Sequence, residues 1–120
     1  MNAFNLTWER IESFPIIYLD GSITLETKQL LEDTYHDIIR QHKAEIMIFD
    51  FSKLTYINSA GISCFFNILK MHNATGGKLF FTGLADHIKK VIELVGLTDY
   101  AQVFETNNNV IKYCNELDEV

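Results

Sequence analysis

The sequence predicts a single α/β domain with a mostly parallel, mixed sheet, an antiparallel hairpin at its N-terminal edge and about four helices. From residue 45 onward, short apolar runs alternate with segments whose apolar residues recur at helical spacing, which indicates parallel strands joined by helices. The run Ile46–Phe49 is apolar without interruption, as in a strand covered on both faces. Two strand-like runs precede the first helix and supply the hairpin.

Two strands should open the chain. The first alternates apolar and polar residues, as a half-exposed strand does, and its apolar members are Phe4, Leu6 and Trp8. A turn at residues 13–15 leads into the second strand, residues 16–19, which should end at Asp20 and Gly21.

A helix and a third strand come next. Thr24 is a candidate N-cap for the helix, because a threonine oxygen can accept hydrogen bonds from the first turn. One side of this helix is apolar and its last turn is cationic, which suits the helix dipole: Leu31, Tyr35, Ile38 and Ile39, then Arg40, His42 and Lys43. The third strand should span residues 45–51 and lead into a loop from Asp50 to Gly61.

Three more helices alternate with two strands in the rest of the chain. Asn58 should open the first of these helices, which ends at the Gly76-Gly77 pair before a strand at residues 78–82. The next helix should close at Gly96-Leu97, before a short strand at residues 102–104 and a last helix. Each helix has apolar residues at the spacing of a buried face: Ile62, Phe65, Phe66 and Leu69; Ile88, Val91, Ile92 and Val95; Val110, Ile111, Cys114 and Leu117.

Composition restricts the class of protein. The chain has 120 residues, 48% of them hydrophobic, so we expect one domain over residues 1–120 with a proper core. The net charge of −6 and the scattered basic residues disfavour nucleic acid as a partner. No apolar run approaches the ~18 residues of a membrane span, and the N-terminus has no export signal. With no CxxC spacing, Cys64 and Cys114 should be reduced core thiols, as in a cytoplasmic protein.

Ser59 is the candidate functional residue. It follows the N-cap Asn58 and should lie in the first turn of a helix, at the positive end of the helix dipole. Its small neighbours Ala60 and Gly61 should leave it unshielded. A hydroxyl in this place can be a nucleophile, a phosphorylation site or part of a cap, and the pattern alone leaves all three open.

Motifs for metals and nucleotides are missing. The four histidines show no metal-binding spacing and should lie at the surface: His36, His42, His72 and His87. There is no GxGxxG or GxxxxGK motif. We therefore expect no metal and no cofactor.

Two alternative chemistries fit the motifs less well. A hydrolase elbow needs glycine two residues before the serine, where this chain has Ile57. A receiver domain would phosphorylate Asp50, with Thr82 at the end of the next strand. That chemistry needs an acidic pair for Mg²⁺, of which only Asp20 is present, and a lysine where Glu105 stands. We expect Asp50 to be a loop or cap carboxylate.

Four motifs lie in one register along almost the whole chain. They are an apolar strand ending at Asp50, the helix start Asn58-Ser59-Ala60-Gly61, the Gly76-Gly77-Lys78 turn before an apolar strand, and Gly96-Leu97 closing a helix. Together they resemble the STAS domain and, within that family, the anti-sigma-factor antagonists. Asp20-Gly21 before a helix also fits the family pattern.

The resemblance implies partner switching by a regulator of transcription that is not itself an enzyme. An anti-sigma factor with an ATP-dependent serine kinase fold would phosphorylate Ser59, and a PP2C-type phosphatase would remove the phosphate. The unmodified domain would bind the anti-sigma factor and release the sigma factor that it restrains. The implied partner-binding residues are Asp20, Asn58, Ala60, Gly61 and Ile62.

One position departs from the family pattern. Asn58 stands where these antagonists usually have aspartate. Asparagine caps a helix about as well, so the fold is unaffected. The missing carboxylate leaves open a second reading, in which the chain is a STAS interaction module of a stress complex or transporter that is not regulated by phosphorylation.

Overall fold

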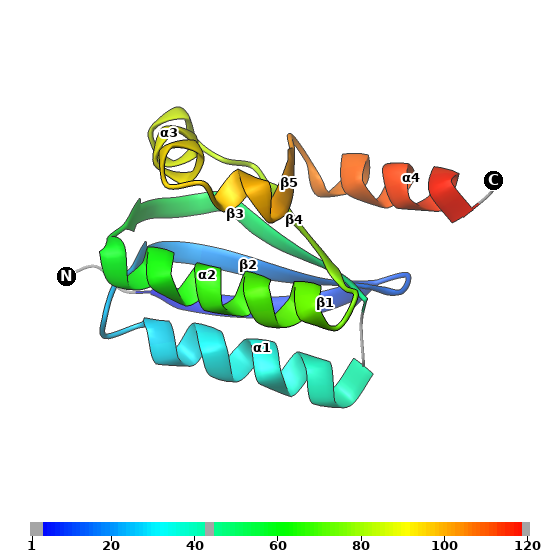
Figure 1. Ribbon diagram of the computed structural model, residues 1–120, viewed down its shortest axis with the longest axis horizontal. Helices are drawn as coiled ribbons and strands as arrows, with labels where there is room; N and C mark the ends of the chain where they lie inside the picture. Colours follow the sequence, from blue (N-terminus) through cyan, green and yellow to red (C-terminus); the bar gives the residue numbers. More distant parts are fainter. Residues whose placement is uncertain (1–3, 43–44, 119–120) are drawn as a thin grey trace.

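The computed structural model describes residues 4–42 and 45–118, and it confirms the predicted α/β architecture (Figure 1). Five strands form one sheet in the order β1-β2-β3-β4-β5, with β1 antiparallel to β2 and all other neighbours parallel. The strands are β1 (Asn5–Ile11), β2 (Phe14–Ile23), β3 (Ile46–Ile57), β4 (Lys78–Thr82) and β5 (Ala101–Phe104). The helices are α1 (Lys28–His42), α2 (Ser59–Ala74), α3 (Asp86–Leu94), the short 3₁₀ helix η1 (Leu97–Asp99) and α4 (Asn107–Asp118). Lys43, predicted at the end of the first helix, lies outside the described residues.

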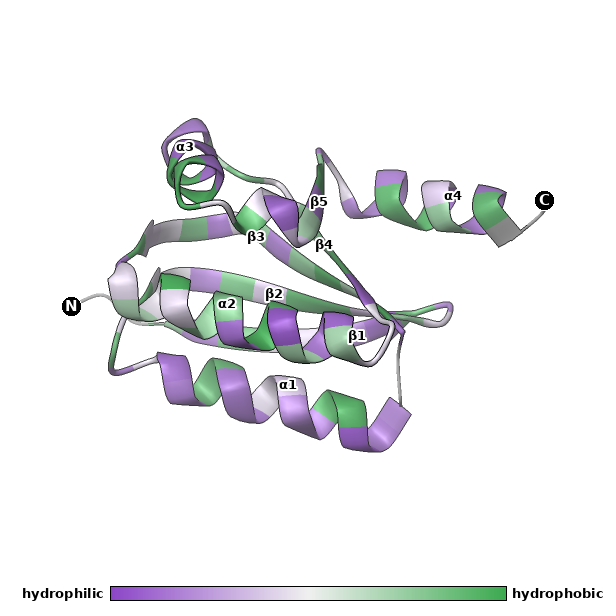
Figure 2. Ribbon diagram, in the orientation of Figure 1, coloured by the Kyte–Doolittle hydropathy of each residue, from purple (hydrophilic) through white to green (hydrophobic). Residues whose placement is uncertain are grey.

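The helices cover the two faces of the sheet unequally. α1, α2 and α3 contribute to a large core on one face, and α4 contributes to a smaller core on the other, outer face. β3 serves both cores, because its side chains alternate: Phe49 points into the large core and Ile48 into the small one. Figure 2 shows that hydrophilic and hydrophobic residues alternate along α1 and α4, as expected for helices with one side on a core.

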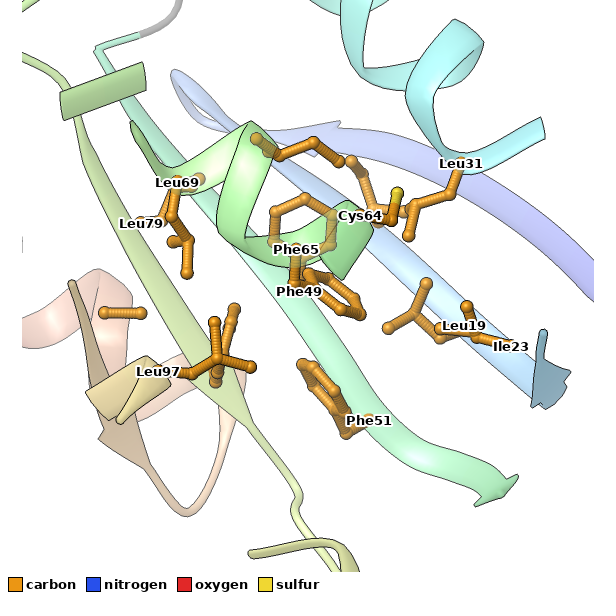
Figure 3. Packing of buried hydrophobic residues seen from close by; sticks show 14 of the residues in the cluster. Leu19, Ile23, Leu31, Phe49, Phe51, Cys64, Phe65, Leu69, Leu79 and Leu97 are labelled. Carbon is orange, nitrogen blue, oxygen red and sulfur yellow. The ribbon is translucent and has the colours of Figure 1, made fainter. Parts of the chain in front are cut away.

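Four phenylalanines form the centre of the large core, and Figure 3 labels three of them, Phe49, Phe51 and Phe65. Phe65 of α2 packs against rings from two strands, with centroid distances of 5.4 Å to Phe49, 5.4 Å to Phe51 and 5.6 Å to Phe81. All four side chains are fully buried. This cluster fixes α2 on the sheet, and therefore fixes the position of the helix N-terminus that carries Ser59.

The strands β2 and β3 are longer than the sequence indicates. β2 does not end at Gly21, and the predicted loop from Asp50 to Gly61 is mostly strand, so that only Asn58 separates β3 from α2. The two strands stay paired to the register Ile23↔Ile57, with register shifts on the way. Such irregularities break the alternation of period two from which a strand is recognised in a sequence. Asp50 consequently lies within β3.

Two details of the helices also differ from the prediction. α1 begins at Lys28, because Thr24 opens a separate turn in which its carbonyl accepts the N–H groups of Thr27 and Lys28. Two residues of the predicted buried faces are exposed, Val95 at the end of α3 by 39% and Leu117 in α4 by 49%. The Gly96-Leu97 ending is confirmed: Gly96 has φ +85° and Leu97 is fully buried.

His72 is buried, contrary to the expectation that all four histidines lie at the surface. Its Nδ1 is 2.9 Å from the Tyr35 hydroxyl on α1, and its Nε2 is 2.8 Å from the carbonyl oxygen of Glu45 at the start of β3. A side chain on Gly77 would collide with the imidazole ring. His72 therefore connects α1, α2 and β3 at the end of the sheet where β3 begins.

We expect acid to destabilise the fold through His72. Burial lowers the pKa of His72 below its usual 6.5, so the unfolded chain takes up the proton more readily than the native one. The stabilisation from neutral His72 is complete above pH ~6.5 and is lost as the pH falls through the folded-state pKa. Urea unfolding at a series of pH values should show a smaller loss of stability on acidification in His72→Gln than in the native protein. If His72→Gln lost as much stability on acidification as the native protein, the burial of His72 would not be the cause of the pH dependence.

Candidate functional site at the N-terminus of α2

Asn58 connects the end of β3 to the start of α2. Its backbone is extended, with φ −107° and ψ −174°, and its side-chain oxygen accepts the N–H groups of Ala60 at 3.1 Å and Gly61 at 3.2 Å. Its own N–H donates to the carbonyl oxygen of Ile23 at 3.2 Å. The predicted N-cap is confirmed, and it is anchored to β2 as well as to the helix.

We expect the cap to depend on the side-chain oxygen and not on its charge. Asn58→Ala should reduce the free energy of unfolding by about 1 kcal/mol, because two N–H groups lose their acceptor. Asn58→Asp should retain the stability or raise it slightly, since a carboxylate at this end suits the helix dipole. Urea unfolding of both variants tests this. Equal losses in the two would show that the hydrogen bonds to Ala60 and Gly61 are not what stabilises this helix start.

Ser59 is the first residue of α2 and is exposed. Among the residues that the structure describes, its hydroxyl has no side-chain hydrogen bond, so Asn58 alone supplies the cap. His87 is the first histidine that follows α2 in the chain, and its Nε2 lies 3.2 Å from the carbonyl oxygen of Thr55. Ser59 is therefore exposed, and no hydrogen bond within the described residues joins its hydroxyl to a histidine or a carboxylate.

Gly61 has a different role from the one expected. It is buried, and a Cβ at this position would lie 2.7 Å from Cγ2 of Ile23 and 2.8 Å from Cγ1 of Ile57. The glycine is needed because α2 crosses very closely over the ends of β2 and β3. The expectation that Gly61 leaves the serine unshielded is thus wrong. The residues on either side of Gly61, Ala60 and Ile62, are half-buried.

The structure separates the two predicted aspartates from Ser59. Asp20 and Asp50 line a hollow formed by β1, β2 and β3, together with Tyr18 and Ser52. Asp50 is neither in a loop nor a helix cap: its carboxylate accepts the Ser52 N–H at 2.8 Å and the Asn107 side-chain amide at 2.8 Å. The five residues 58–62 come together at α2, and within the described residues no hydrogen bond or ion pair joins Asp20 to them.

Sequence reasoning missed two exposed apolar side chains near the helix start. Leu25 is 64% exposed in the turn that follows Ile23, whose carbonyl holds Asn58, and Tyr56 is 51% exposed two residues before Asn58. Exposed aromatic and aliphatic groups beside a polar site are typical of protein-binding surfaces. The sequence predicts a loop at residues 52–57, and it therefore gives no indication that Tyr56 lies on a strand beside this helix start.

Comparison with known protein families shows to which family this chain belongs. The profile of the STAS domain matches residues 5–110. This chain belongs to the STAS domain family. The prediction from the four sequence motifs is confirmed, whereas the extension of the domain to the full range 1–120 stays a prediction.

Individual STAS proteins agree with this result. The anti-sigma-B factor antagonist of Staphylococcus aureus is 26% identical over 94 residues, which cover 78% of this chain and 86% of that protein. The phosphorylated form of the Bacillus cell fate determinant SpoIIAA has a TM-score of 0.70 at 19% identity, over 93% of this chain and 99% of the other. A sulfate transporter family protein from Wolinella succinogenes has a TM-score of 0.77 at 16% identity, over 92% and 91%. At these identities the two structures establish the STAS fold alone.

Proposed function

We propose that this STAS protein is an anti-sigma-factor antagonist that binds its anti-sigma factor at the N-terminus of α2 and is released by phosphorylation of Ser59. The observation that carries the proposal is the exposed Ser59 hydroxyl, which has no hydrogen bond in the described part of the chain, on a helix start that Asn58 already holds in place. The name of the Staphylococcus aureus relative supports the choice of partner.

Phosphorylation at this position acts on binding and spares the fold. A phosphoserine adds about −1.5 to −2 charge at neutral pH, and the N-terminus of a helix tolerates negative charge. Because Ser59 is exposed and its hydroxyl has no hydrogen bond to lose among the described residues, we expect the native structure to accept the group without rearrangement. In a closed interface the same charge would be stripped of water and would oppose docking.

The partners in this scheme are an anti-sigma factor with serine kinase activity and a PP2C-type phosphatase. The unmodified protein binds the anti-sigma factor through Asn58, Ala60 and Ile62, with Leu25 and Tyr56 as apolar contacts beside them. The protein is then a substrate and regulator in the cytoplasm, and not an enzyme. No helix in residues 4–42 and 45–118 is long and apolar enough to cross a membrane.

A second candidate function rests on Asn58. In this alternative, a STAS module of a stress complex or transporter uses the same surface without phosphorylation. The fold shared with the sulfate transporter family protein of Wolinella succinogenes supports the transporter form of this alternative. The two functions differ in whether a kinase modifies Ser59.

Phosphorylation can be assigned by mass spectrometry with a control serine in the same helix. Incubation with the anti-sigma factor and ATP should add one phosphate to the native protein and to Ser63→Ala, but none to Ser59→Ala. Ser63 is also exposed on α2, so it reports modification that is not specific for the helix start. Failure of the bound partner to phosphorylate the native protein would favour the module that is not regulated in this way.

A further inference from the structure

The outer face of the sheet is only half covered. α4 packs over the end near the β1–β2 turn, where its buried residues Val110 and Ile111 meet Phe14, Ile16 and Ile48. The rest of this face carries polar side chains and two hollows, of about 280 Å³ and 420 Å³, which share Tyr18, Asp50 and Ser52. We call this region the open face; its other polar residues are Asn5, Thr7, Asp20, Lys53, Thr82, Glu105, Thr106, Asn107 and Asn108.

Asp50 lies in the middle of the open face with a fixed orientation. It stands on the central strand β3, opposite Tyr18 of β2 and Thr82 of β4. Thr82 donates to the Asn107 side-chain oxygen at 2.5 Å, and this orients the Asn107 amide toward the Asp50 carboxylate. A half-buried carboxylate is thus held by neutral donors, although a paired cation is the usual partner of such a group.

Within the residues that the structure describes, no ion pair reaches the Asp50 carboxylate. The single ion pair within the described ranges joins Arg40 to Asp37 on α1, a helix that covers the other face of the sheet. The hollows contain Asp20, Asp50 and Glu105 but only one basic residue, Lys53. The pKa of Tyr18 is raised to about 12, mainly by burial and by its hydrogen bond to Glu9, with smaller contributions from the charges of Glu9 and Asp50.

We propose that the open face is a second docking surface, which binds an arginine- or lysine-bearing segment of a partner protein with its cation against Asp50. Charge complementarity selects this occupant, because a second copy of a chain with net charge −6 and any phosphate-bearing ligand would be repelled. A bare metal ion is disfavoured, since no group of three or more ligating side chains is found in the part of the chain that the structure describes. The surface lies on the opposite side of the sheet from α2, so both surfaces can be occupied at once.

The test uses a labelled peptide with three arginines and a matched peptide in which citrulline, neutral and of the same shape, replaces each arginine. The arginine peptide should bind the native protein in a fluorescence anisotropy titration and should shift the amide NMR signals of Ser52 and Lys53. Asp50→Asn should weaken this binding about tenfold, a loss of ~1.4 kcal/mol. Asp33→Asn removes the same charge from the exposed side of α1 and should leave the affinity unchanged.

Several outcomes would overturn the proposal: no binding at millimolar peptide, equal binding of the citrulline peptide, or equal weakening by Asp33→Asn. A thermal melt of Asp50→Asn separates loss of the carboxylate from loss of the fold, and NMR shifts mapped on the native protein do not depend on any variant. Ser59→Asp should bind the arginine peptide like the native protein. The test therefore stays independent of phosphorylation and of the anti-sigma factor.

Discussion

Ser59→Asp should abolish binding to the anti-sigma factor while the protein stays folded. A carboxylate in the first turn of a helix is favoured by the dipole by ~0.3–1 kcal/mol, so α2 should not lose stability. A partner that closes over Ser59 and Ala60 must strip water from that charge. An unpaired interfacial charge commonly costs ~2–5 kcal/mol, which corresponds to a loss of affinity of about 30-fold or more.

Isothermal titration calorimetry against the anti-sigma factor measures this loss, and thermal melts of each variant report on the fold. Ser59→Ala is the matched control: it removes an exposed hydroxyl that has no hydrogen bond among the described residues, so binding should persist although phosphorylation is blocked. Undiminished binding by the aspartate variant would rule out a switch at Ser59. Loss of binding together with loss of the melting transition would assign the residue a structural role.

The overall architecture was accessible from the sequence because its signals are local. The uninterrupted apolar run at Ile46–Phe49 and the helical spacing of Phe65 and Leu69 identify buried elements without knowledge of what they contact. The order of elements then restricts the topology, since strands that alternate with helices become parallel neighbours. The Asn58 cap could be predicted for the same reason: a side chain that bonds N–H groups two and three residues away is a local feature.

The errors concern residues whose role depends on distant parts of the chain. The extension of β3 to Ile57 is set by pairing with β2, and the register shifts between the strands remove its local pattern. His72 is buried because Tyr35, 37 residues away, and the Glu45 carbonyl satisfy both of its ring nitrogens. Nothing near Asp50 in the sequence indicates that Asn107 would reach its carboxylate. Long-range partners of polar groups are what a single sequence does not reveal.

The aromatic core and the Ser59 site are connected through α2, which carries both Phe65 and Ser59. Gly61 lets α2 lie close on Ile23 and Ile57, and one helical turn further on Phe65 inserts between the rings of β3 and β4. The exposed serine is therefore mounted on a rigidly packed helix and not on a flexible loop. A rigid support keeps the binding surface preorganised, so that a partner need not order it on docking.

Phe65→Ala should cause the largest loss of stability of the substitutions considered, about 3–5 kcal/mol. Phe65 is fully buried and contacts Phe49, Phe51 and Phe81, so removal of its ring leaves a cavity at the centre of the large core. Phe66→Ala is the matched control, because the neighbouring ring on the same helix is only partly buried and packs at the edge against Tyr100. Urea unfolding followed by far-UV circular dichroism should give a clearly smaller loss for Phe66→Ala. If the two substitutions cost the same, the four-ring cluster would not be what holds α2, and with it Ser59, on the sheet.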